Sequence, residues 1–114
     1  MTIINHTSRA DIPVVIIDQD RLTDGIGLQE LYKEIVDEME HGARQNVVLD
    51  FELVETVTSP GLGMLIRVKI KFDEKAARLH LCGLRPNVAE VIRKTALNRL
   101  FPMHDSVETA LRTI

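Results

Sequence analysis

The sequence has little of several residue types on which small proteins often build a site. It contains one cysteine, Cys82, no tryptophan, and an aromatic fraction of only 4%. A single cysteine excludes an internal disulfide and fits a reducing compartment, so we expect a cytoplasmic protein. The four histidines are scattered, without the i, i+4 spacing of helical metal ligands and without a cysteine cluster beside them. We therefore expect no metal site.

Charge of one sign and long apolar runs are lacking as well. Lysine and arginine number 14 and aspartate and glutamate 17, for a net charge of −3, which provides no basic field for a nucleic-acid backbone. The longest apolar runs, such as 14–17 and 61–66, are far shorter than the roughly 20 residues that span a bilayer. The start, "MTIINHTSRA", has no basic segment followed by a long apolar stretch. We expect neither nucleic-acid binding, nor membrane insertion, nor a secretory signal.

Motifs for catalysis or cofactor binding are also missing. The sequence contains no Walker-type loop, no dinucleotide fingerprint and no Gly-x-Ser-x-Gly elbow. The "GLG" at 61–63 lacks the further glycine and the lysine that cradle phosphates. The sequence thus predicts a protein that is not an enzyme, with no catalytic residue and no cofactor.

What is present is an alternation of strand-like and helix-like segments. Short β-branched runs at 13–17, 46–51 and 78–82 predict strands, and "LFPMHDS" (100–106) predicts a short edge strand. Apolar residues at helical spacing predict helices beginning near 28, 61, 86 and 107. The pattern indicates an α/β fold in which a roughly four-stranded mixed sheet packs with about four helices. We expect one domain over residues 1–114, with 1–10 as a flexible or edge-strand N-terminus.

The stretch "TVTSPGLGMLI" (56–66) joins a strand-like run to a helix. Proline favours the first helical turn, so Pro60 predicts Ser59 as the N-cap, its hydroxyl accepting from the N–H of Gly61 or Leu62. Two interpretations stay open: a serine that only caps, or an exposed hydroxyl that carries a phosphate. The stripe of the following helix is wide, and core packing explains most of it, with Met64 as the main candidate for a docking surface.

Longer motifs carry a resemblance to a known family. "NVVLDFELVETVTSPGLGMLI" and the later "RLHLCGLRPNVAEVIRKTALNRLFPMHDSVETAL" resemble the STAS domain of bacterial anti-sigma factor antagonists over nearly the whole chain. The resemblance implies Ser59 as the phosphoacceptor, followed by Gly61, with Asp24 matching a loop aspartate near the partner surface. Thr58 stands where the family usually has aspartate, and is a secondary candidate for phosphorylation. Pro60 stands where the family has serine or threonine.

The resemblance also implies a function. The protein would bind an anti-sigma factor with serine-kinase activity, and phosphorylation at Ser59 would release it. The expected partner-binding residues are Asp24, Thr58, Ser59, Pro60, Gly61 and Met64. The departures at Thr58 and Pro60 favour an alternative, an accessory or scaffold STAS subunit of a transporter or signalling assembly without phosphorylation. A small-molecule binder or enzyme is the third class, and the sequence leaves the oligomeric state unknown.

Overall fold

The computed structural model describes residues 2–6, 12–23, 25–41 and 45–114. Within them the main sheet has five strands in the order β1-β2-β4-β6-β7. The edge strand β1 runs antiparallel to β2, and the other neighbours are parallel. The sheet is therefore mixed, as predicted. Its strands are β1 (Thr2–His6), β2 (Pro13–Ile17), β4 (Asn46–Asp50), β6 (Arg78–Cys82) and β7 (Met103–His104).

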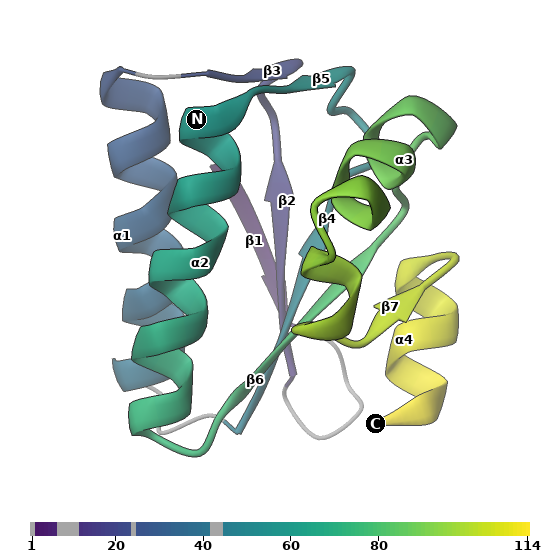
Figure 1. Cartoon of the computed structure of the whole chain (residues 1–114). Helices are drawn as coiled ribbons and strands as arrows, with labels where there is room; N and C mark the ends of the chain where they lie inside the picture. Colours follow the sequence, from purple (N-terminus) through teal and green to yellow (C-terminus); the bar gives the residue numbers. More distant parts are fainter. Residues whose placement is uncertain (1, 7–11, 24, 42–44) are drawn as a thin grey trace.

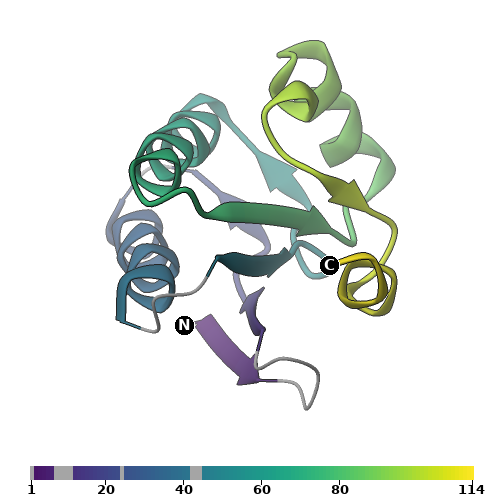
Figure 2. The same cartoon turned by 90° about the horizontal axis from the view of Figure 1, so that it is seen from below.

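Helices cover both faces of this sheet (Figures 1 and 2). Side chains of α1, α2 and α3 form the main core against one face, and α4 packs on the other face over a smaller core. The described part of the chain thus contains the four α-helices that the periodicity predicted, and the α/β fold is confirmed. They are α1 (Ile26–His41), α2 (Ser59–Glu74), α3 (Pro86–Lys94) and α4 (Val107–Thr113), with a short 3₁₀ helix η1 (Leu97–Arg99) after α3.

Alternation along β6 shows how the sequence divides side chains between the two cores. Leu79 and Leu81 belong to the main core, whereas Cys82 belongs to the smaller one. Successive residues of a strand point to opposite faces, so His80 lies on the α4 side. A strand that is buried on both faces is typical of a parallel sheet covered by helices.

The main sheet matches the roughly four-stranded mixed sheet that was predicted, with β1 as the edge strand that was one of the two expectations for residues 1–10. Besides β1, the described residues include a separate pair of two-residue strands, β3 (Arg21–Leu22) and β5 (Thr56–Val57), which lie parallel. Two residues are too few to show an alternating pattern, so pairing between segments distant in sequence creates these strands. Figure 1 shows the pair directly above the start of α2.

Candidate functional site

The β3–β5 pair holds the chain in place just before α2 begins. The backbone N–H groups of Glu55 and Thr56 donate to the Asp20 carbonyl at 2.7 and 3.1 Å. The N–H of Thr58 then donates to the Leu22 carbonyl at 3.1 Å. The residues immediately before α2 are therefore fixed to the segment that follows β2, at the carboxyl-end edge of the main sheet.

Ser59 is the first residue of α2 and not its N-cap, so that prediction was wrong by one position. The N-cap is Thr58, with φ −110° and ψ 179°. Its carbonyl accepts from the Leu62 N–H at 3.1 Å, and its Oγ1 donates to the Leu22 carbonyl at 3.3 Å. The two bonds to Leu22 keep Thr58 extended, which places Ser59 inside the first turn. Among the described residues no hydrogen bond involves the Ser59 hydroxyl, and the residue is exposed.

Gly61 is required by close packing beneath the same junction. A Cβ at Gly61 would lie 2.7 Å from the Leu22 carbonyl oxygen and 3.1 Å from a methyl group of Val57. At Gly63, one half-turn further, a Cβ would have no atom within 4 Å. Gly61 is therefore a packing residue that lets α2 touch β3, and its backbone is buried and not open to a ligand.

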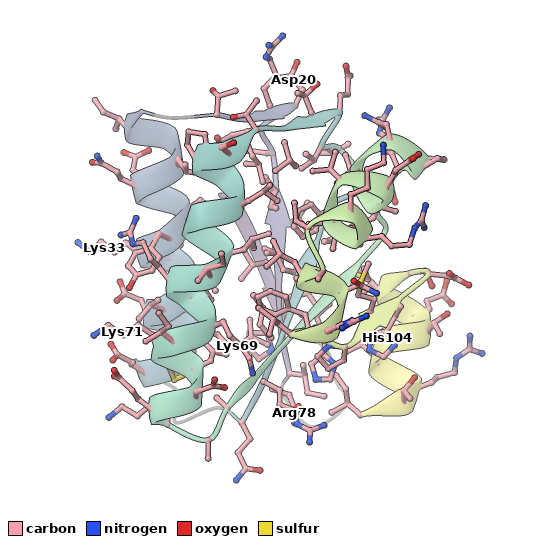
Figure 3. The ribbon with its side chains drawn as sticks, in the orientation of Figure 1. Asp20, Lys33, Lys69, Lys71, Arg78 and His104 are labelled. Carbon is pink, nitrogen blue, oxygen red and sulfur yellow. The ribbon has the colours of Figure 1, made fainter. Side chains whose placement is uncertain are left out.

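Only some of the residues that were expected to bind the partner are exposed. Ser59 and Pro60 are exposed and Thr58 is half-buried, all at one edge of the molecule. Met64 is only 1% exposed and packs in the main core, so it presents no docking surface and that expectation is corrected. Gly61 is buried against β3. Asp24 lies outside the described residues, whereas Asp20 is exposed at this edge (Figure 3).

An exposed apolar stripe runs down α2 from Ser59. Ile66 is 42% exposed, and Ile70 is 56% exposed. The spacing 59, 63, 66, 70 places these residues on one helical face. We call Ser59, Gly63, Ile66 and Ile70 the α2 stripe. The pattern alone could not reveal it, because α2 carries more apolar residues than the core accepts.

Two further exposed apolar side chains lie near the same edge. Ile26, the first residue of α1, is 73% exposed, and Leu53, in the loop between β4 and β5, is 45% exposed. Figure 1 shows the start of α1, the β3–β5 pair and the start of α2 along one end of the molecule. Ile26 and Leu53 therefore add exposed apolar surface on the elements next to the β3–β5 pair.

Asp50, a further acidic residue at this edge, supports a loop. It closes β4, is buried, and its Oδ1 accepts from the Glu52 N–H at 2.9 Å. Burial raises the pKa of Asp50 above its ordinary value. Gly83 has φ +69°, and a Cβ there would lie 2.7 Å from the same oxygen. The carboxylate is therefore enclosed by backbone and has the contacts of a structural group.

A buried polar cluster lies under α4, away from Ser59. The Nδ1 of His80 lies 3.1 Å from the Nε2 of His104, and the Nε2 of His80 lies 2.9 Å from the Oδ1 of Asn46. His80 thus faces polar partners, and burial lowers its pKa to about 4, with the nearby His104 and Arg78 adding to the effect. Burial raises the pKa of the Cys82 thiol to about 12, so it is not a reactive nucleophile.

The described residues contain no cluster of three or more histidine, cysteine, aspartate or glutamate side chains that could hold a metal ion. Of the helices in these ranges, none has the length and apolar character needed to cross a bilayer. The arrangement at the Ser59 edge is an exposed hydroxyl on a fixed backbone beside exposed apolar side chains. Such a surface can bind another protein and accept a modification.

Comparison with known proteins gives a consistent result. Residues 4–110 match the family described as STAS domain. A putative anti-sigma factor antagonist, BtrV of Bordetella bronchiseptica, is 30% identical over 82 residues, which cover 72% of this chain and 70% of that protein.

Two solved structures share the fold. An anti-sigma-factor antagonist (STAS) domain protein from Planctomyces limnophilus superposes with a TM-score of 0.81 at 20% identity, covering 98% of this chain and 95% of that one. The Bacillus cell fate determinant SpoIIAA in its phosphorylated form superposes with a TM-score of 0.72 at 18% identity, covering 100% of both chains.

Proposed function

This chain belongs to the STAS domain family, and we propose that it is an anti-sigma factor antagonist, a non-enzymatic protein that binds an anti-sigma factor and is released by phosphorylation of Ser59. The observation that carries the proposal is the exposed Ser59 hydroxyl at the first position of a helix whose start is fixed by Leu22. A kinase can reach such a hydroxyl without unfolding the domain.

Thr58 is a poorer acceptor than Ser59. Its Oγ1 donates to the Leu22 carbonyl and its side chain is half-buried. A phosphate on Thr58 would break that bond and push against β3, whereas Ser59 has neither constraint. We therefore place the modification on Ser59 alone.

A phosphate on Ser59 would oppose binding more than it stabilises the helix. It adds about −1.5 to −2 charges, which the positive end of the helix dipole favours by about 0.3–2 kcal/mol. Pro60 has no N–H to donate, so the first turn has fewer groups to hold the phosphate. Covering that charge with a protein surface costs several kcal/mol in desolvation. The complex therefore loses more free energy than the free protein gains.

The α2 stripe supplies the apolar part of this interface in our proposal. Ile66 and Ile70 lie on the face of α2 that begins at Ser59, so a partner resting on these isoleucines reaches the hydroxyl at one end. Apolar side chains at the centre of an interface and a charge-sensitive group at its rim suit a reversible switch.

The test is titration calorimetry with a serine-kinase anti-sigma factor from the same genome. We expect Ser59→Asp to weaken binding about a hundredfold, which corresponds to about 2.7 kcal/mol. Ser59→Ala, which adds no charge, is the matched control and should bind within about threefold of the wild type. A folded Ser59→Asp variant with unchanged affinity would contradict the switch.

The departures at Thr58 and Pro60 favour one alternative, a scaffold role without phosphorylation. Mass spectrometry after incubation with the partner kinase and ATP separates the two functions. Addition of one phosphate that is lost in Ser59→Ala supports the switch. Binding of the partner without any phosphate transfer supports the scaffold.

A further inference from the structure

A second candidate site lies at the opposite end of α2 from Ser59. A cavity of about 320 Å³ opens between the last turns of α2, the first half of β6 and the segment that follows η1. Its floor is apolar, because Phe72, Leu79 and Phe101 line it and are buried. The proposed switch uses none of these residues.

Three cationic residues line this cavity, and one of them, Arg78, also lines the cavity beside His80 on the α4 side. They are Lys69 from α2, Arg78 from β6 and Arg99 from η1. Figure 3 shows Lys69 extending toward the side where Arg78 lies, while Lys71 points away on the outer side of α2. The Lys69 Nζ lies 2.8 Å from Asp73 Oδ1, but within the described ranges the two arginines have no ion-pair partner. No carboxylate of the described residues lines the cavity.

The edge of β6 adds a backbone donor to the cavity. The N–H of Arg78 donates to Gln45 on the β4 side, and the N–H of Leu81 donates to Pro102 on the β7 side. Backbone groups of a parallel strand alternate between its two neighbours, so the N–H and C=O of Leu79 face the β7 side. β7 pairs with β6 only from Leu81 onward. The backbone groups of Leu79 therefore point at the cavity and not at another strand.

From this geometry we propose that the cavity binds a small organic anion, a phosphate or carboxylate joined to an apolar body. The charged group would lie between Lys69 and Arg99 and accept from the Leu79 N–H, with the apolar body on Phe72 and Phe101. The volume equals that of about ten water molecules at about 30 Å³ each, which suits a ligand of roughly ten to fifteen non-hydrogen atoms. The open edge before β7 is too short for an added peptide strand, so the occupant is a small molecule.

The test uses two probes with different apolar bodies, phenyl phosphate and octanoate, titrated into the full chain by heteronuclear NMR. We expect at least one probe to bind with saturating shifts at the Leu79 amide and at Arg99, and none at Leu53. Arg99→Gln should weaken that binding about tenfold, since a hydrogen bond to a charged group is lost. Lys71→Gln, which removes an exposed cation of α2 outside the cavity, should leave it within twofold.

Two control compounds test whether binding needs both the charged group and the apolar body. Inorganic phosphate lacks the apolar body and octanol lacks the charge, and both should bind at least tenfold more weakly. Equal binding of phosphate and phenyl phosphate would overturn the proposal, as would equal losses in Arg99→Gln and Lys71→Gln. Absence of saturation by both probes at 10 mM, about the weakest affinity expected for ligands of this size, would overturn it as well.

Discussion

At the scale of single residues, the two glycines of α2 have opposite roles. A methyl group at Gly61 would meet the Leu22 carbonyl oxygen at 2.7 Å, whereas one at Gly63 meets nothing within 4 Å. We expect Gly61→Ala to destabilise the protein by about 1–3 kcal/mol through overpacking. Gly63→Ala should stabilise it by about 0.5–1 kcal/mol, because alanine is the better helix former. Urea denaturation measures the free energy of unfolding of both variants. A Gly61→Ala variant as stable as the wild type would show that Gly61 is not tightly packed against β3.

The buried histidine predicts a pH dependence of stability. The pKa of His80 is about 4 in the folded state, below its ordinary value of 6.5, chiefly because of burial and then because of His104 and Arg78. Its contribution is therefore complete above pH 6.5 and is lost as the pH falls toward 4. We expect about 2 kcal/mol less stability at pH 5 than at pH 7.5 from this group.

The His80→Gln variant isolates that contribution from the carboxylates, which titrate in both proteins. Glutamine is uncharged at both pH values and retains a polar group beside Asn46 and His104. The difference in unfolding free energy between wild type and variant should therefore change by about 2 kcal/mol from pH 7.5 to 5. A difference independent of pH would mean that His80 does not resist protonation in the native state.

Residue-scale prediction from sequence was accurate where the cause is local. The last helix was expected to begin near 107, and it begins at Val107, where the Ser106 hydroxyl caps it by accepting from the Thr109 N–H at 3.2 Å. The cap of α2 was placed one residue late, because the Leu22 carbonyl, 36 positions away in sequence, holds Thr58. The preferences of proline and serine for the start of a helix depend on neighbouring residues and do not account for an acceptor so distant in sequence.

At the scale of elements, α2 separates a core face from a binding face. Met64 and Val68 are buried, whereas Ile66 and Ile70 are exposed. We expect Ile66→Ser with Ile70→Ser to weaken anti-sigma factor binding at least tenfold while changing the free energy of unfolding by less than about 1 kcal/mol. Met64→Ala should lower stability by about 2–5 kcal/mol. Calorimetric binding and urea denaturation of the same samples test this, and full affinity in the double variant would rule out the α2 stripe as the contact.

Helices and long strands were predictable because their periodicity spans many residues. The two-residue strands β3 and β5 were not, although they position Ser59. The face of α2 that packs against the sheet was not predictable either. Apolar residues occupy so much of the helix circumference that periodicity does not specify it. In the structure Met64 and Val68 pack in the main core, while the exposed Arg67 lies over the Tyr32 ring of α1 at 4.3 Å.

At the scale of the whole molecule, α2 places the two proposed sites at opposite ends. Sixteen residues of helix span about 24 Å, with Ser59 at the start and Phe72 near the end. Charges on the surface are screened over about 8 Å at physiological ionic strength, so a phosphate on Ser59 has little direct effect on a ligand near Arg99. Coupling would require α2 to move as a body, yet the contact of Gly61 with Leu22 holds one end and the buried Phe72 holds the other.

We therefore expect the two ends to act independently. Ser59→Asp should change the affinity for the better-binding NMR probe by less than about twofold, and Arg99→Gln should change anti-sigma factor affinity by less than about twofold, because sites this far apart without shared partners have additive effects. Calorimetry on the two single variants and the double variant measures the coupling directly. A change above fivefold in either direction would show that α2 links the ends, and a small anion would then regulate partner binding through the helix.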